Sequence, residues 1–124
     1  MWIELSNVVK TYGAGAQAEG RMVLNGLNLQ AGRGDTLAIM GPSGSGKTTL
    51  LNLMGTLDAP DGGEIRVGEQ LFSAMDTPAK LAFRSRIAGF VFQFHFLLSE
   101  FSALENVTLP MAKRSISRAG SPVA

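Results

Sequence analysis

Eight consecutive residues in the first half of the chain, GPSGSGKT at 41–48, match the pattern G-x-x-x-x-G-K-[ST]. Glycines permit a tight turn that leaves successive backbone N–H groups pointing inward, where the positive end of the following helix helps to hold a polyanion. In this pattern Lys47 reaches the β- and γ-phosphates, and the Thr48 hydroxyl is a ligand of Mg²⁺. The pattern therefore predicts a nucleoside triphosphate site, and the alternative is a glycine-rich turn that matches by chance.

The segments on either side of the loop favour the functional interpretation. Residues 36–40 (TLAIM) have no polar alternation, which predicts a central strand covered on both faces. Residues 47–57 place leucines and a methionine at helical spacing. Strand, glycine loop and helix in this order are the context in which the pattern binds phosphate, so a chance match is the weaker interpretation.

Other patterns predict short strands and two further helices. Asp76 and Pro78 indicate a helix that runs to about Arg86, and the capping box at 102–105 indicates a helix that begins at Ala103 and is interrupted early by Pro110. Residues 13–20 and 60–63 read as loops or turns. The remaining strands are predicted at 3–9, at 22–29, around 65–67 and at 90–92.

Composition excludes several classes of protein. Length predicts one small domain of 124 residues, and a formal net charge of +1 gives no field strong enough to capture nucleic acid. Zero cysteines exclude a disulfide framework and a thiolate zinc site. The N-terminus lacks the pattern of a secretory signal, so the chain is expected in the cytoplasm. The most apolar stretch, 87–98, is too short to span a bilayer, so any link to a membrane is expected to be made through a partner.

The sequences of three segments resemble those of a known protein family. GPSGSGKTTLL at 41–51, LDAPDGGEI at 57–65 and GFVFQ at 89–93 closely resemble the first half of an ABC transporter nucleotide-binding subunit. Within that superfamily, QFHFLL at 93–98 and FSALENV at 101–107 look most like the lipoprotein-releasing (LolD-type) ATPases. The related macrolide and peptide export ATPases share a sequence similar to ALENV at 103–107. The resemblance implies an α/β P-loop NTPase fold of the ABC type, truncated after the Q-loop, with an N-terminal antiparallel β subdomain.

The same resemblance implies a set of site residues for ATP and Mg²⁺. Tyr12 matches the aromatic residue that stacks on adenine, with packing on the sheet as the alternative. Gln93 matches the Q-loop glutamine, which contacts Mg²⁺ and the region of the attacking water. Thr48 is the other metal ligand. The nucleotide-binding residues are Tyr12, Gly41, Pro42, Ser43, Gly44, Ser45, Gly46, Lys47, Thr48 and Thr49.

The resemblance also implies partners. In the family the segment after the Q-loop touches integral membrane permease subunits, the ATPase subunits form a homodimer, and the complex lies at the inner face of the inner membrane. His95, the single histidine, is not assigned a catalytic role, because the family's switch histidine comes much later in the chain. Phe90 and Phe92 are expected in the core by alternation, whereas the apolar residues that follow form either a groove for a partner helix or part of the core.

The 124 residues contain no counterpart of the signature motif, the Walker B acids, the D-loop or the switch histidine. Residues 1–111 are therefore interpreted as a partial ABC-type domain and 112–124 as a disordered tail outside the family. Three functions follow as hypotheses: a transporter ATPase subunit, a truncated remnant that binds nucleotide weakly or not at all and does not hydrolyse it, or a small-molecule kinase. The kinase hypothesis leaves Gln93 and its surroundings unexplained.

Overall fold

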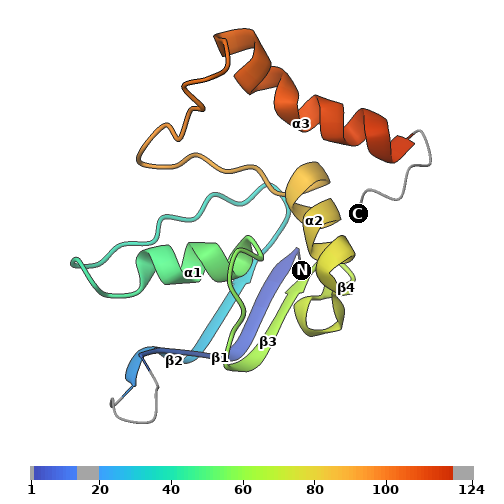
Figure 1. Ribbon diagram of the computed structural model, residues 1–124. Coiled ribbons are helices and arrows are strands. Elements are labelled where there is room, and N and C mark those ends of the chain that lie inside the picture. Colours follow the sequence, from blue (N-terminus) through green and yellow to red (C-terminus); the bar gives the residue numbers. More distant parts are fainter. Residues whose placement is uncertain (1, 14–19, 119–124) are drawn as a thin grey trace. The chain divides into compact units, whose positions relative to one another are not determined.

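The computed structural model describes residues 2–13 and 20–118, and the chain divides into two compact units after Met75. The first unit holds four strands, the helix α1 (Lys47–Met54) and a short 3-10 helix (Phe72–Ala74). The second unit holds α2 (Thr77–Arg86) and α3 (Ala103–Arg118). Figure 1 labels the strands and the α-helices along the chain. Each unit is described by itself below.

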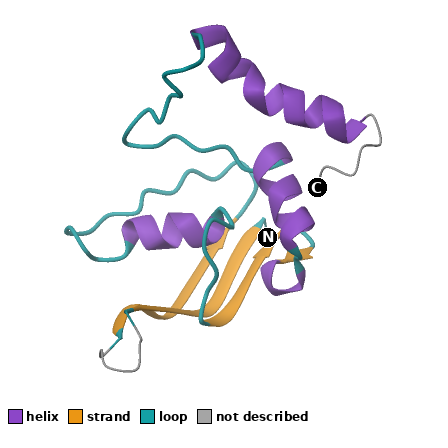
Figure 2. Ribbon diagram, viewed as in Figure 1, coloured by secondary structure: helices purple, strands orange, loops and turns teal. Residues whose placement is uncertain are grey.

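The strands of the first unit form one antiparallel sheet. β1 (Ile3–Tyr12) pairs with β2 (Arg21–Ala31) on one edge and with β3 (Gly62–Val67) on the other, and β4 (Gln70–Leu71) completes the order β2-β1-β3-β4. The sheet is drawn in orange in Figure 2. The expected N-terminal antiparallel subdomain is therefore confirmed, and most of the predicted loop at 13–20 lies outside the described residues.

The core of the first unit is formed by apolar side chains from the sheet and from α1. On β3, Ile65 and Val67 alternate with exposed residues, as expected for a strand with one covered face. Leu50 and Leu53 are the buried residues of α1, one helical turn apart. The other buried apolar residues of this unit are Leu5, Val8, Leu24, Ala31 and Phe72.

Two predicted strands are absent, and these predictions were wrong. Residues 36–40 form an irregular connection in which Leu37 is 46% and Met40 87% exposed, instead of a covered central strand. Residues 90–92 are likewise irregular, and Phe90 and Phe92 are exposed rather than part of the core. A strand exists only through ladder hydrogen bonds to a neighbour, and neither segment has such a neighbour among the described residues. The β-strand propensity of apolar residues does not by itself provide the neighbouring strand with which a segment must pair.

The helices of the second unit begin where their capping residues predict. The Asp76 side chain accepts a hydrogen bond from the Ala79 N–H at 2.9 Å, and the Ser102 hydroxyl accepts one from the Glu105 N–H at 3.2 Å. The Glu105 carboxylate, however, accepts from the Ser102 hydroxyl instead of from its backbone. Both helices are therefore started by local side-chain bonds.

Helix α3 continues through Pro110 to Arg118, although the sequence predicts an interruption at Pro110. Proline removes one backbone hydrogen bond, but the alanine, lysine and arginine residues that follow it favour the helical state. Residues 119–124 lie outside the described residues. None of the helices described here combines the length and the apolar content required to span a bilayer.

Candidate functional site

The glycine loop joins the irregular connection at 36–40 to the first turn of α1. Gly44 and Gly46 have φ values of 80° and 98°, a region of backbone conformation that other residues rarely adopt. A Cβ atom on Gly46 would lie 3.0 Å from a Val23 methyl group and 3.1 Å from a Leu24 methyl group of β2. Gly46 therefore lets the start of α1 approach the sheet closely, and this fixes the loop against β2.

The loop wraps around the ammonium group of Lys47. Nζ of Lys47 donates hydrogen bonds to the carbonyl oxygens of Gly41 at 2.6 Å and Pro42 at 2.8 Å, and lies 3.4 Å from the Ser45 hydroxyl. The Ser45 N–H bonds back to the Pro42 carbonyl at 3.2 Å, which closes the turn. An ammonium group has three donors, so these contacts hold the charge of Lys47 at the mouth of the loop.

The N-terminus of α1 has the properties of an anion site. Gly46 caps this end, no described side chain caps it through a hydrogen bond, and the first turn contains no acidic residue. The N–H groups of the first turn have no partners within a helix, and the helix dipole gives this end a partial positive charge. These N–H groups and the ammonium of Lys47 together favour a bound polyanion.

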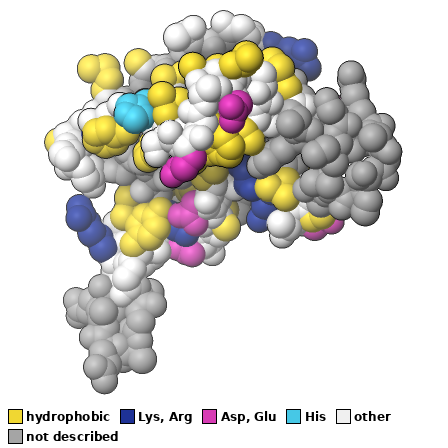
Figure 3. Space-filling view, turned by 45° about the horizontal axis from the view of Figure 1, so that its top comes forward, with side chains coloured by type: hydrophobic (Ala, Val, Ile, Leu, Met, Phe, Trp, Pro, Cys, Tyr) yellow, Lys and Arg dark blue, Asp and Glu magenta, His cyan; other side chains and the backbone are white. Residues whose placement is uncertain are grey.

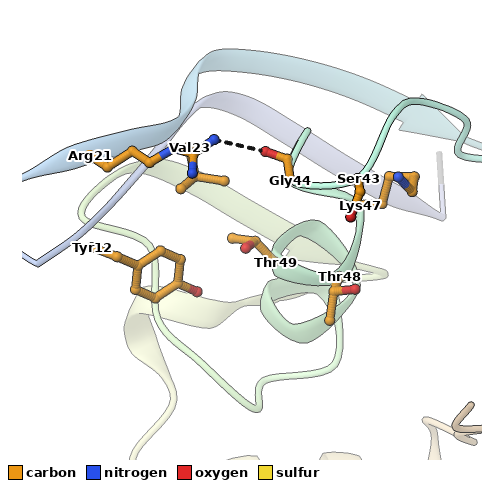
Figure 4. A pocket seen from close by; sticks show the side chains of 9 residues that line it. Tyr12, Arg21, Val23, Ser43, Gly44, Lys47, Thr48 and Thr49 are labelled. Carbon is orange, nitrogen blue, oxygen red and sulfur yellow. Dashed lines mark hydrogen bonds between the residues drawn. The ribbon is translucent and has the colours of Figure 1, made fainter.

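A pocket of about 340 Å³ opens at this end of the helix (Figure 4). The structure brings Tyr12, at the end of β1, to the same pocket as the loop, although it precedes Gly41 by 29 positions in the sequence. Its side chain is 41% exposed, so part of the ring is accessible. None of the lining residues is acidic, which suits an anionic ligand. They are Tyr12, Arg21, Val23, Ser43, Gly44, Gly46, Lys47, Thr48 and Thr49.

Two lining residues, Arg21 and Val23, were missed by the sequence analysis. Arg21 begins β2, and its guanidinium donates a hydrogen bond to the Gly44 carbonyl at 3.3 Å, which places a second cation beside the loop (Figure 4). The sequence holds no sign of this contact, because it depends on the antiparallel pairing of Arg21 with Tyr12 across β1 and β2. That pairing puts the first residue of β2 and the last residue of β1 at the same pocket.

Gln93 belongs to the second unit, whereas Thr48 and the pocket belong to the first. The Gln93 side chain is exposed in a bend of the irregular segment that follows α2. Its assignment to the metal and the attacking water therefore stays a prediction. His95 has a local role, since its Nδ1 accepts a hydrogen bond from the Leu97 N–H at 3.1 Å.

The segment around Gln93 exposes an aromatic surface. The rings of Phe90 and Phe92 stack with centroids 5.7 Å apart, and Phe96 makes edge contacts with Phe92 and Phe94. Phe94 and Phe96 are each about two-thirds exposed, and the surface view shows hydrophobic side chains reaching solvent (Figure 3). The rings of this segment thus contact one another, and large parts of Phe94 and Phe96 remain exposed.

Asn106 of α3 fixes the end of this aromatic segment. Its side-chain oxygen accepts from the Leu98 N–H at 2.9 Å, and its NH₂ group lies within 3.2 Å of the carbonyl oxygens of Leu98, Phe101 and Ser102. One amide side chain therefore satisfies several backbone groups of the turn before the helix. The sequence analysis assigned no role to Asn106.

Comparison with known proteins places these features in a family. The sequence model of a family described as ABC transporter matches residues 24–122. The lipoprotein-releasing system ATP-binding protein LolD of Anaeromyxobacter dehalogenans is 53% identical over 109 residues, which cover 88% of this chain and 45% of that protein. The LolD protein of Saccharophagus degradans is 48% identical over 117 residues, 94% of this chain and 50% of that one.

Solved structures show the same likeness. The dimeric ATP-binding cassette MJ0796 in a post-hydrolysis state bound to ADP and Pi superposes with a TM-score of 0.81 at 41% identity, covering 89% of this chain and 47% of that one. The sequence-based prediction of an ABC-type P-loop fold is thereby confirmed. The chain spans about half the length of the curated relatives it matches.

Proposed function

This chain belongs to the ABC transporter family, and we propose that it forms part of an ATP-binding subunit that energises the release of lipoproteins from the inner membrane. The observation that carries the proposal is the pocket at the N-terminus of α1, which is lined by Lys47, Arg21 and the glycine loop and by no acidic residue. The resemblance to LolD proteins supports lipoprotein release as the work to which ATP is coupled.

The donor set of the pocket fits ATP. The N–H groups of the loop and of the first turn of α1 hold the phosphates, and the ammonium of Lys47 exchanges loop carbonyls for phosphate oxygens. Tyr12 stacks on the base, and Arg21 adds positive charge at the loop. No carboxylate lines the pocket to repel the triphosphate.

Mg²⁺ would be held by the hydroxyl of Thr48, with Gln93 as a second ligand that also contacts the attacking water. Hydroxyl and amide oxygens are suitable ligands for this hard cation, which neutralises the charge between the terminal phosphates when bound. Thr48 supplies its oxygen from the first turn of α1, next to Lys47.

The partners in this proposal are integral membrane permease subunits and a second ATPase subunit. The exposed rings of Phe94 and Phe96, which follow Gln93, offer an apolar surface to a permease, and the dimeric structure of MJ0796 supports pairing of two ATPase subunits. The subunit would accordingly sit at the inner face of the membrane. The division into a partial domain at 1–111 and a tail at 112–124 remains a prediction.

Removal of the Thr48 hydroxyl tests the ATP and Mg²⁺ site. We expect the wild-type chain to bind ATP more tightly with Mg²⁺ than with EDTA, and Thr48→Val to lose that difference, because a lost metal contact lowers metal affinity by about 10-fold or more. Thr48→Ser keeps the hydroxyl and should keep the difference. Equilibrium dialysis with labelled ATP measures all three proteins. An equal Mg²⁺ effect in Thr48→Val would contradict the assignment of this ligand.

A further inference from the structure

A polar cluster surrounds Tyr12, one of the residues that line the pocket. The Tyr12 hydroxyl donates a hydrogen bond to Oδ2 of Asp58 at 2.8 Å, and Nζ of Lys10 donates to Oδ1 of Asp58 at 3.1 Å. Lys10 also donates to the Ala59 carbonyl at 2.8 Å. Asp58 thus joins two side chains of β1 through its two oxygen atoms.

The strand geometry explains why Lys10 and Tyr12 meet the same carboxylate. They are two residues apart on β1, so their side chains point to the same face of the sheet. Lys10 is 8% exposed, and its ammonium lies over the Tyr12 ring, 5.1 Å from the ring centroid. One face of the ring is therefore covered by a cation, and a base can stack only on the other face.

The loop that carries Asp58 is itself fixed to β1. The Asp61 carboxylate accepts a hydrogen bond from the Thr11 N–H at 2.6 Å, and the Asp61 N–H donates to the Val9 carbonyl at 2.8 Å. Asp58 also accepts a bond from the Ala59 N–H at 2.8 Å. The carboxylate is thus held in place independently of the Tyr12 hydroxyl.

Charge strengthens this arrangement. Burial alone would raise the pKa of Asp58, but the hydrogen bonds from Tyr12, the Ala59 N–H and Lys10 hold that pKa below its usual value. Burial would likewise lower the pKa of Lys10, but Asp58 outweighs this effect and raises it. Both groups are therefore charged near neutral pH, and an ionised acceptor forms a stronger hydrogen bond with the Tyr12 hydroxyl than a neutral one does.

We propose that Asp58 is a positioning residue for nucleotide binding, which anchors the hydroxyl of Tyr12 so that the free face of the ring is oriented toward the base. This inference rests on the proposed function. An anchored ring has already lost its rotational freedom before the nucleotide arrives, so less binding free energy is lost on ordering it. Lys10 contributes by holding Asp58 and by covering the opposite face.

Two variants remove the anchor in different ways. Tyr12→Phe keeps the ring and leaves the Lys10–Asp58 ion pair in place, whereas Asp58→Ala removes the acceptor. Asp35→Ala is the matched control, because the Asp35 carboxylate also accepts a backbone N–H bond in a loop of this unit but does not contact Tyr12. Each full-length variant is titrated with ATP and with inorganic tripolyphosphate, which carries the phosphates without the base.

We expect Tyr12→Phe and Asp58→Ala each to raise the Kd for ATP by about three- to tenfold. This loss is smaller than the whole contribution of base stacking to affinity, because the ring itself remains in both variants. The Kd for tripolyphosphate should stay unchanged in both, and combining the two substitutions should add no further loss, because each removes the same bond. Asp35→Ala should bind both ligands like the wild type.

Different results overturn different statements. Wild-type affinity for ATP in Tyr12→Phe overturns the anchoring role even if Asp58→Ala fails to fold. Equal loss of ATP and tripolyphosphate binding in the two variants also overturns it, since the effect then lies at the phosphates. A wild-type chain that is folded but binds neither ligand overturns the proposed function itself, whereas tight tripolyphosphate binding without any gain from the base overturns only the role of Tyr12.

Discussion

Replacing Lys47 with alanine is expected to weaken ATP binding by about 10- to 100-fold, the equivalent of losing charged hydrogen bonds worth about 1.5–3 kcal/mol. Lys47 is the cation that the loop encloses, with its ammonium bonded to the carbonyl groups of Gly41 and Pro42. Calorimetric titration of the purified chain with ATP measures the change. Tripolyphosphate should lose affinity to a similar extent, because the contact is with phosphate and not with the base.

The Lys47 variant needs controls for folding and for charge. Lys47→Met keeps most of the aliphatic stem and should show the same loss, while circular dichroism confirms that both variants are folded. Lys80→Ala removes a lysine from α2, outside the residues that line the pocket, and should bind ATP like the wild type. Equal affinity in Lys47→Met and the wild type would contradict a phosphate contact by this side chain.

The second large effect is expected at Gly63, where a methyl group has no space. A Cβ atom on Gly63 would come within 2.2 Å of the Asn7 carbonyl oxygen and 2.6 Å of the Ser6 carbonyl oxygen, both of them backbone atoms of β1. Gly63 also has a φ of 79°. We therefore expect Gly63→Ala to lower the free energy of unfolding by more than about 3 kcal/mol, since the paired strands must separate to relieve the clash.

Gly34 provides a matched control for the backbone conformation. Its φ of 82° is nearly the same, but a Cβ atom there would have no neighbour within 4 Å. Gly34→Ala should consequently cost only about 1–2 kcal/mol, the strain of a side chain in the left-handed region. Urea denaturation followed by the fluorescence of Trp2 compares the two. Similar losses in both variants would show that strain, and not the contact with β1, determines the effect.

The pairing at Gly63 matters for the site because β1 carries Tyr12 to the pocket. The register between β1 and β3 shifts between Ser6 and Val9, opposite this glycine, and Asn7 has a φ of 51°. Such a bulge turns the strand and re-aims the side chains beyond it. Lys10 and Tyr12 both lie beyond the shift, so the cluster around Asp58 depends on it.

Local chemistry made part of the molecule predictable from the sequence. The glycine pattern, the capping residues Asp76 and Ser102 and the apolar pair Ile65 and Val67 each report a short-range constraint, and the structure shows the corresponding turn, helix starts and strand. Each of these features depends on residues within a few positions of one another.

The features that the sequence analysis did not predict correctly depend mostly on contacts between residues far apart in the sequence. Residues 36–40 have the composition of a central strand, but composition does not supply the neighbouring strand that a ladder requires. The bond between Tyr12 and Asp58 joins residues 46 positions apart, and Arg21 reaches the loop only through strand pairing. Helix α3 continues through Pro110 because the summed helix propensity of the surrounding residues outweighs the cost of one proline. A prediction based on the proline alone misses this sum.

The central claim is that the backbone of the glycine loop binds the phosphates of ATP at the start of α1. Amide chemical shifts of the folded, isotope-labelled chain, recorded while Mg²⁺ and ATP are added, test it most directly. The account predicts that the largest shift changes occur at Gly44, Gly46 and Lys47, with smaller changes at Tyr12 and Arg21, the other side of the same pocket. Saturating ATP that leaves the loop amides unshifted, or shifts only residues elsewhere in the chain, would contradict it.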